Sequence, residues 1–188
     1  NNNDKKFCIT KSFVVDDLDN VLSDQTLRYN LGINENIQFN DIFTFKVHLP
    51  VTGMYDLSFI TEELNGFDSS LSAEDYDINL RILEKTNIGL IDKKLYFYRS
   101  PEALGKGRIR MPVRIDVSES HLLTILKYKN HYNYEAAILE WNLRRFIFFS
   151  GYTQTKKYAL QGFLNLNFSV LSRLVLYKAV FRFLFFWK

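Results

Sequence analysis

The sequence has a single cysteine, only three prolines and no long apolar run. Cys8 has no second cysteine with which to form an internal disulfide, which excludes a disulfide-rich secreted scaffold and is typical of a reducing compartment. No stretch of about 18 uncharged apolar residues is present, which argues against an ordinary membrane-spanning helix. Because residues 1–6 also lack the apolar core of a signal peptide, we expect a cytoplasmic chain.

Acidic residues are missing from the last quarter of the 188-residue chain. Glu140 is the last of the 21 acidic residues, and eight of the 24 basic residues follow it. The composition, 47% hydrophobic and 24% charged, excludes wholesale disorder. An acidic body followed by a basic, phenylalanine-rich tail predicts two regions with different neighbours.

The first part of the chain has the composition of strands and turns. Residues 7–15 are β-branched and aromatic, which predicts a strand, and residues 21–22 are expected to return beside it as a hairpin. We expect a loop over residues 30–40 and a β-prone segment over residues 42–51. Residues 55–64 are expected to pass from a short strand into a short helix.

A helix with an apolar stripe is predicted after residue 72. Ser72 is the expected N-cap, and Tyr76, Leu80 and Leu83 recur at helical spacing. A short strand over residues 95–98 is expected to follow.

From Ser118 onward the pattern is helical, with one helix to about residue 129, a second over residues 134–149 and a third from about residue 155. The predicted fold class is therefore α/β, with a mixed sheet and flanking helices over residues 1–115 and a helical C-terminal extension over residues 116–188.

Three carboxylates, Glu74, Asp75 and Asp77, crowd the first turn of the predicted helix that follows Ser72. One interpretation is electrostatic, because acids at a helix N-terminus each contribute about 0.3–1 kcal/mol. The other is catalytic, because an ionised carboxylate that faces a cleft can accept a proton from a hydroxyl. The local pattern alone leaves both open.

Several short motifs occur here in an order and spacing that resemble the acceptor-side half of family 2 glycosyltransferases, which have the GT-A fold. The segments that carry this resemblance are Thr52-Gly53-Met54, Gly66-Phe67-Asp68, Glu74-Asp75, Leu80-Arg81 and Leu95-Tyr96-Phe97-Tyr98-Arg99. They cover residues 52–99, and the rest of the chain matches more loosely.

The resemblance implies inverting transfer of a sugar from a nucleotide-diphosphate donor to an acceptor hydroxyl, in polysaccharide or glycolipid synthesis. It implies that Asp75 is the general base and that Glu74 orients the base or the acceptor. The residues that it places on the acceptor side are Thr52, Gly53, Gly66, Asp68 and Arg99.

The chain departs from this family in lacking the donor-binding half, with its alternating strands and helices and its Asp-x-Asp metal motif. We therefore expect a partial GT-A-like domain that binds no donor by itself, although the complete enzyme would use Mn²⁺ or Mg²⁺. Asp17 and Asp19, which are formally Asp-x-Asp, and His121 are weak metal candidates. The alternative is a non-catalytic module, either an interaction module or one at the membrane periphery, that keeps the acceptor-side scaffold.

Two basic segments remain open to different interpretations. Lys106, Arg108, Arg110 and Arg114 belong either to a solvated loop or to a diphosphate-binding one. Residues 155–188, whose apolar stripe is predicted to be poor, pack against the missing donor-binding half or a second subunit, or lie on an anionic membrane surface. No nucleic-acid partner is expected.

Overall fold

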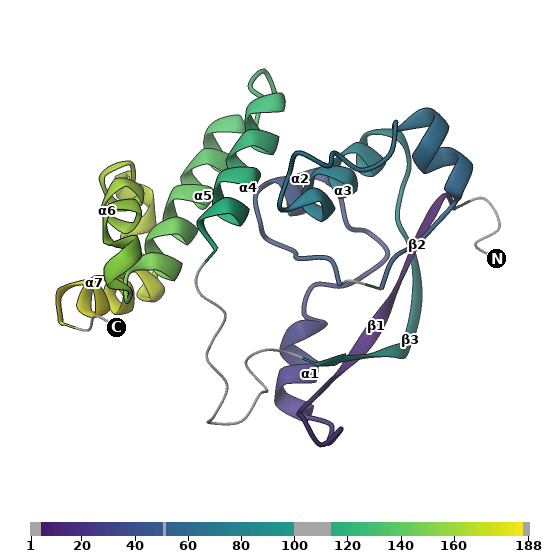
Figure 1. Ribbon diagram of the computed structural model, residues 1–188, viewed down its shortest axis with the longest axis horizontal. Helices are drawn as coiled ribbons and strands as arrows, with labels where there is room; N and C mark the ends of the chain where they lie inside the picture. The colour runs from purple at the N-terminus through teal and green to yellow at the C-terminus, as the bar shows by residue number, and fades with distance from the viewer. Residues whose placement is uncertain (1–4, 51, 100–113, 186–188) are drawn as a thin grey trace. The chain divides into compact units, whose positions relative to one another are not determined.

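The computed structural model describes residues 5–50, 52–99 and 114–185 (Figure 1). The described residues form two compact units. The sheet unit comprises those within Asn1–Ser70 and Glu74–Pro112, and the helical unit comprises those within Leu71–Ala73 and Val113–Lys188. Each unit has its own buried residues, so each is described separately below.

The sheet unit is built on a three-stranded mixed sheet of order β2-β1-β3. The central strand β1 (Phe7–Val15) is antiparallel to β2 (Met54–Tyr55) and parallel to β3 (Gly89–Arg99). The predicted strand over residues 7–15 is confirmed. The expected hairpin return is reduced to one isolated bridge between Val15 and Val21, because a helix begins at Ser23.

Beyond the short β2, three side chains take the place of a partner strand along β1. Thr52 Oγ1 accepts from Thr10 N–H (3.1 Å) and donates to Thr10 C=O (2.7 Å). The Asn30 amide accepts from Ser12 N–H (2.9 Å) and donates to Ser12 C=O (2.8 Å). Thr26 Oγ1 accepts from Val14 N–H (2.9 Å). Backbone groups at every second position of β1 are therefore satisfied without a strand beside them.

Four helices complete the sheet unit. They are α1 (Ser23–Tyr29), α2 (Phe39–Phe43), the single-turn π-helix η1 (Phe59–Glu63) and α3 (Glu74–Lys85). The predicted passage from a strand into a short helix over residues 55–64 is confirmed by β2 and η1. The predicted strand over residues 95–98 is part of the longer β3.

The prediction of a β-prone segment over residues 42–51 was wrong for the residues that the structure describes. The Asp41 carboxylate accepts a hydrogen bond from the Gln38 backbone N–H (3.0 Å) and so caps the N-terminus of α2. Phe45 then has a positive φ of 55°, which turns the chain. Its ring stacks on Tyr76 (centroids 4.9 Å apart), whose hydroxyl donates to Phe43 C=O (2.9 Å). The apolar run is thus a buried helix and turn that pack on α3.

The helical unit contains α4 (Ile115–Lys127), α5 (Tyr134–Phe149), α6 (Lys156–Leu164) and α7 (Leu174–Phe185), with 3₁₀ turns at Thr153–Thr155 and Phe168–Val170. The prediction of a helix over residues 134–149 is confirmed. The core of the unit is formed by Leu143, Phe146, Phe149, Ala159, Val170, Leu176 and Ala179. Among the described residues, no helix has the length and apolarity needed to cross a membrane.

Close approach of α5 and α6 depends on a glycine. A Cβ atom at Gly162 would lie 2.7 Å from Asn142 O and 3.0 Å from Phe146 N. Both are backbone atoms of α5, so they cannot move aside as a flexible side chain would. Glycine therefore sets the spacing of the two helices.

Replacing Asn30 tests whether its side chain substitutes for a strand. We expect Asn30→Ala to lower the free energy of unfolding by about 2 kcal/mol, because Ser12 N–H and C=O lose their partner in a buried setting. Urea unfolding followed by circular dichroism measures the change. The control is Asn87→Ala, an exposed asparagine between α3 and β3, where a change of under about 0.5 kcal/mol is expected. Equal effects of the two variants would contradict the role of Asn30.

Candidate functional site

The first turn of α3 presents two exposed carboxylates, Glu74 and Asp75. Asp75 Oδ1 accepts from the backbone N–H of Tyr76 (2.8 Å), which orients the carboxylate. The third acid of the turn, Asp77, is fully buried and pairs with Arg81 (2.8 Å). The three acids that the sequence places together therefore separate into two that face outward and one that belongs to the interior.

The N-cap of α3 is displaced from its predicted position. The helix begins at Glu74, so Ala73 rather than Ser72 precedes its first residue. Within the helical unit, the Ala73 N–H donates to Ser120 Oγ (3.0 Å), and Ser72 hydrogen-bonds Asp116. The reason for the displacement is that both residues before the helix are engaged by α4.

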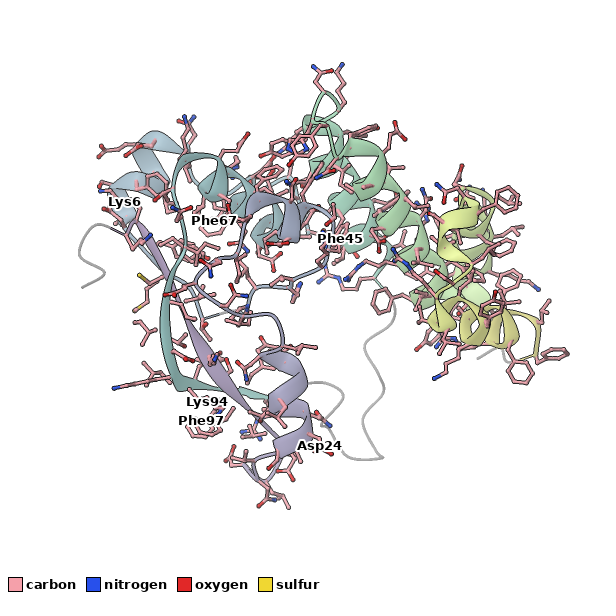
Figure 2. The ribbon with its side chains drawn as sticks, turned by 180° about the vertical axis from the view of Figure 1, so that it is seen from behind. Lys6, Asp24, Phe45, Phe67, Lys94 and Phe97 are labelled. Atoms are coloured by element: carbon pink, nitrogen blue, oxygen red, sulfur yellow. The ribbon has the colours of Figure 1, made fainter. Side chains whose placement is uncertain are left out.

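Phe7, Tyr55 and Phe67 form an aromatic cluster where β1 pairs with β2. Tyr55 stacks on Phe7 with ring centroids 4.7 Å apart and meets Phe67 edge-to-face at 5.9 Å. The pKa of Tyr55 is raised, first by burial and then by the negative charge of Asp75. The negative charge of Asp75 therefore acts on the Tyr55 hydroxyl and disfavours its ionisation. Figure 2 labels Phe67 and Lys6 at the end of the sheet where β1 begins.

Gly53 fits closely against this aromatic cluster. A Cβ atom on residue 53 would lie 2.6 Å from the Phe7 ring and 2.8 Å from the Tyr55 hydroxyl. The hydroxyl of the neighbouring Thr52 forms hydrogen bonds with both the N–H and the C=O of Thr10. Gly53 therefore packs against the aromatic cluster, and Thr52 hydrogen-bonds the segment before β2 to β1.

Arg81 holds the loop that carries Gly66. Its guanidinium donates to Leu64 C=O and to Gly66 C=O (2.9 Å) and pairs through Nε with Asp77. Asn65 and Gly66 have positive φ angles of 55° and 74°. Since a Cβ at Gly66 would meet nothing within 4 Å, backbone conformation rather than space favours glycine there.

Asp68 closes a local turn after the loop. Its Oδ1 accepts from Ser70 N–H (3.1 Å) and from Ser70 Oγ (2.6 Å). The resemblance assigns Gly66 and Asp68 to the acceptor side. In the structure both belong to the connection that leads from the end of η1 past Phe67 toward α3.

Arg99 lies at the opposite end of the sheet from Asp75. It pairs with Val15 in the β1–β3 register, whereas Tyr55, on which the charge of Asp75 acts, pairs with Phe7. Phe7 and Val15 are the two ends of β1, which corresponds to about 26 Å of strand. The structure therefore does not bring Arg99 to Asp75.

Asp17 and Asp19 belong to the turn at that far end of β1. Asp16 closes the turn by accepting from the backbone N–H groups of Leu18 (2.8 Å) and Asn20 (2.9 Å), and hydrogen bonds from Asn20 lower its pKa. Arg99 forms an ion pair with Asp19 and donates to Asp16 C=O. The acids of the Asp-x-Asp sequence are thus in a closed polar turn and not beside Asp75.

His121 is in α4, which belongs to the helical unit. Over residues 5–50, 52–99 and 114–185, no three side chains among His, Cys, Asp and Glu gather as a metal-binding group. Of the basic segment 105–114, only Arg114 is within the described residues. It pairs with Asp116, and its hydrogen bond, followed by that of Ser72, lowers the pKa of Asp116 to about 2.

Sequence reasoning missed the contact between Tyr55 and Phe67 and the electrostatic effect of Asp75 on Tyr55. It also missed the ion pair between Lys6 and Asp56 (2.7 Å), which lowers the pKa of Asp56 below its usual range and raises that of Lys6. Asp56 additionally accepts from Ser58 Oγ (2.7 Å) and Phe59 N–H (3.2 Å) at the start of η1. These contacts depend on the antiparallel pairing of β1 with β2, and no pattern in the sequence predicted that pairing.

A scan of protein-family models, a search of curated proteins and a search of solved structures each find no match to this chain. Two exposed carboxylates at the N-terminus of α3, one of which acts electrostatically on Tyr55, suit a ligand that offers hydroxyl donors and apolar C–H faces.

The Arg81 contacts generate a stability prediction. We expect Arg81→Met to lower the free energy of unfolding by about 3 kcal/mol, because the buried Asp77 carboxylate loses its cation and the Leu64 and Gly66 carbonyls lose their donor. Arg81→Lys should recover only part of this loss, since an ammonium lacks the guanidinium fork. Lys85→Met, an exposed change in the same helix, is the control for urea unfolding. A loss no larger in Arg81→Met than in this control would contradict the prediction.

The coupling between Asp75 and Tyr55 generates a second prediction. We expect Asp75→Asn to lower the Tyr55 pKa, because the nearby negative charge that opposes ionisation of the phenol is removed. The measurement is a pH titration of tyrosine ¹³Cζ chemical shifts, with the Tyr55 signal assigned from Tyr55→Phe. Glu74→Gln is the matched comparison and should change the pKa less. An unchanged Tyr55 pKa in Asp75→Asn would contradict the placement of the two groups.

Proposed function

We propose that this chain is the acceptor-side part of a family 2-like glycosyltransferase with a GT-A-like domain. The observation that supports the proposal is that residues 52–55, 64–68 and 74–81 are linked to one another. Tyr55 contacts Phe67, Arg81 of α3 bonds the loop at Leu64 and Gly66, and the charge of Asp75 acts on Tyr55. These are the segments on which the sequence resemblance rests, apart from the strand that ends at Arg99. The rings of Tyr55 and Phe67, which are 38% and 46% exposed, offer apolar surface, and Asp75, whose charge acts on Tyr55, offers a hydrogen-bond acceptor. Such a combination suits the mixed polar and apolar faces of a sugar.

In this proposal Asp75 is the general base. The Tyr76 N–H fixes its orientation through Oδ1, so Oδ2 accepts the proton of the acceptor hydroxyl. The acceptor oxygen forms a bond to the anomeric carbon of the donor, and the bond to the diphosphate breaks on the opposite face, so that the diphosphate leaves with the electron pair. Glu74, in the same turn, orients the acceptor. The product is a glycan or glycolipid lengthened by one sugar.

A Mn²⁺ or Mg²⁺ ion would neutralise the diphosphate in the complete enzyme. Asp17 and Asp19 do not fit such an ion beside Asp75, because they belong to the turn at the far end of β1 and Asp19 is paired with Arg99. No step of the proposal therefore passes through a metal. The nucleotide-sugar donor is bound outside the described residues.

A non-catalytic, glycan-binding module is the second candidate. The exposure of Glu74 and Asp75 favours it, because a general base works best where water is excluded. Under the first proposal, the donor-binding half supplies the missing wall over these carboxylates. The two candidates predict the same binding of an acceptor glycan and differ in the effect of Asp75 on transfer.

Asp75→Asn tests the proposal in the complete enzyme, with radiolabelled nucleotide sugars and a glycan acceptor. We expect transfer to fall by about 10²–10⁴-fold, the contribution of a general base, while the chain binds acceptor glycan within about twofold of its original affinity by NMR titration. Asp24→Asn, an exposed acid in the first turn of α1, is the matched control and should leave both unchanged. Retained transfer in Asp75→Asn would remove Asp75 as the base. Glycan binding without any transfer by the unaltered enzyme would favour the binding module.

A further inference from the structure

Helix α7 has a buried stripe, contrary to the poor stripe expected from the sequence. Leu176 and Ala179 are almost fully buried in the core of the helical unit, and Val180 and Phe183 are partly buried against it. These four residues follow the i, i+3, i+4, i+7 spacing of one helix face. The sequence pattern hid this stripe because large apolar residues occur on the opposite face as well.

The opposite face of α7 is apolar and exposed. At about 100° per residue, Leu174, Phe181 and Phe185 lie directly opposite the buried stripe. Their exposed fractions are 77%, 57% and 66%, and the rings of Phe181 and Phe185 lie 5.0 Å apart. Tyr177 and Leu184, at 55% and 60%, widen this face on one side. We refer to these five residues as the outer face of α7.

The chain before α7 extends the outer face. The Tyr177 hydroxyl donates to Leu171 C=O (2.7 Å), so Leu171, which is 47% exposed, lies next to it. A ridge of apolar side chains therefore continues from the helix into the preceding turn. An isolated exposed leucine needs no explanation, but a contiguous aromatic and aliphatic face on one helix indicates an interaction surface.

Cations border the outer face on its other side. Lys178 and Arg182 project there by the same helical geometry and are both exposed. Arg182 is fixed in place, since its Nε donates to Ser150 Oγ (2.8 Å) and its guanidinium also reaches Ile147 C=O at the end of α5. Residues 141–188 contain no acid, so no carboxylate of this segment offsets these charges.

We propose that the outer face of α7 lies on the surface of an anionic lipid bilayer. Its aromatic and leucine side chains enter the boundary between head groups and acyl chains. Lys178 contacts the anionic head groups, and Arg182, which is held at the end of α5, adds positive charge beside them. The charge distribution selects this occupant over a second copy of the chain. A two-fold interface would bring the same patch, and hence its cations, against themselves, with no acid from residues 141–188 to pair with them.

Vesicle binding by the full chain tests this proposal, with flotation of vesicles of phosphatidylcholine alone or with about one third phosphatidylserine. We expect binding to the anionic vesicles at least tenfold tighter than to the neutral ones, and weaker at high salt. Phe181→Ser combined with Phe185→Ser should weaken binding at least tenfold. Phe97→Ser, which changes a similarly exposed phenylalanine (62%) of the sheet unit, is the matched control and should have no effect.

A charge variant distinguishes this membrane role from non-specific hydrophobic adsorption. Lys178→Glu should weaken binding to anionic vesicles by about fivefold or more and leave binding to neutral vesicles unchanged. Because the substituted side chains are exposed, thermal unfolding followed by circular dichroism should be unaltered. Absence of vesicle binding, or equal binding to both lipids, would overturn the proposal. A concentration-dependent dimer in sedimentation velocity that the Phe181→Ser, Phe185→Ser variant abolishes would also overturn it, in favour of a second copy.

Discussion

The sheet unit depends on how the central strand β1 satisfies its backbone on the side where β2 is too short to pair with it. Thr52, Asn30 and Thr26 each bond to one residue of β1, at every second position. A buried strand with unpaired N–H and C=O groups would be costly, so these three side chains are a requirement of the fold. They also hydrogen-bond α1, the residue that follows it and the segment before β2 to the same strand.

This arrangement decides which residues meet at the candidate site. Because β2 pairs only with the start of β1, Tyr55 stacks on Phe7, contacts Phe67 and is subject to the charge of Asp75. Because β3 runs parallel to β1, its last residue, Arg99, is carried to the far end. Most of the segments that carry the family resemblance are therefore linked to α3, whereas the segment that ends at Arg99 is not.

The sequence predicted local structure well where one pattern dominated. The helix over residues 134–149 and the strand over residues 7–15 have clear periodicity and composition, and both are found. It failed for residues 42–50, because tertiary burial turned a β-prone run into a helix and a tight turn. It also failed for α7, because a helix that is apolar on two faces shows no single stripe. For the candidate site, the acids of α3 could be named in advance, but their aromatic neighbours could not.

The amino-acid sequence by itself determined the acids that begin α3, the absence of acids after Glu140 and the alternation of apolar residues, since these are properties of residue order. Only the tertiary structure decided that Asp77 is buried and paired with Arg81 while Asp75 is exposed and acts electrostatically on Tyr55. It likewise decided which face of α7 packs and which is left exposed. The physical reason is that strand register and helix packing join residues far apart in sequence, and no local pattern encodes those distances.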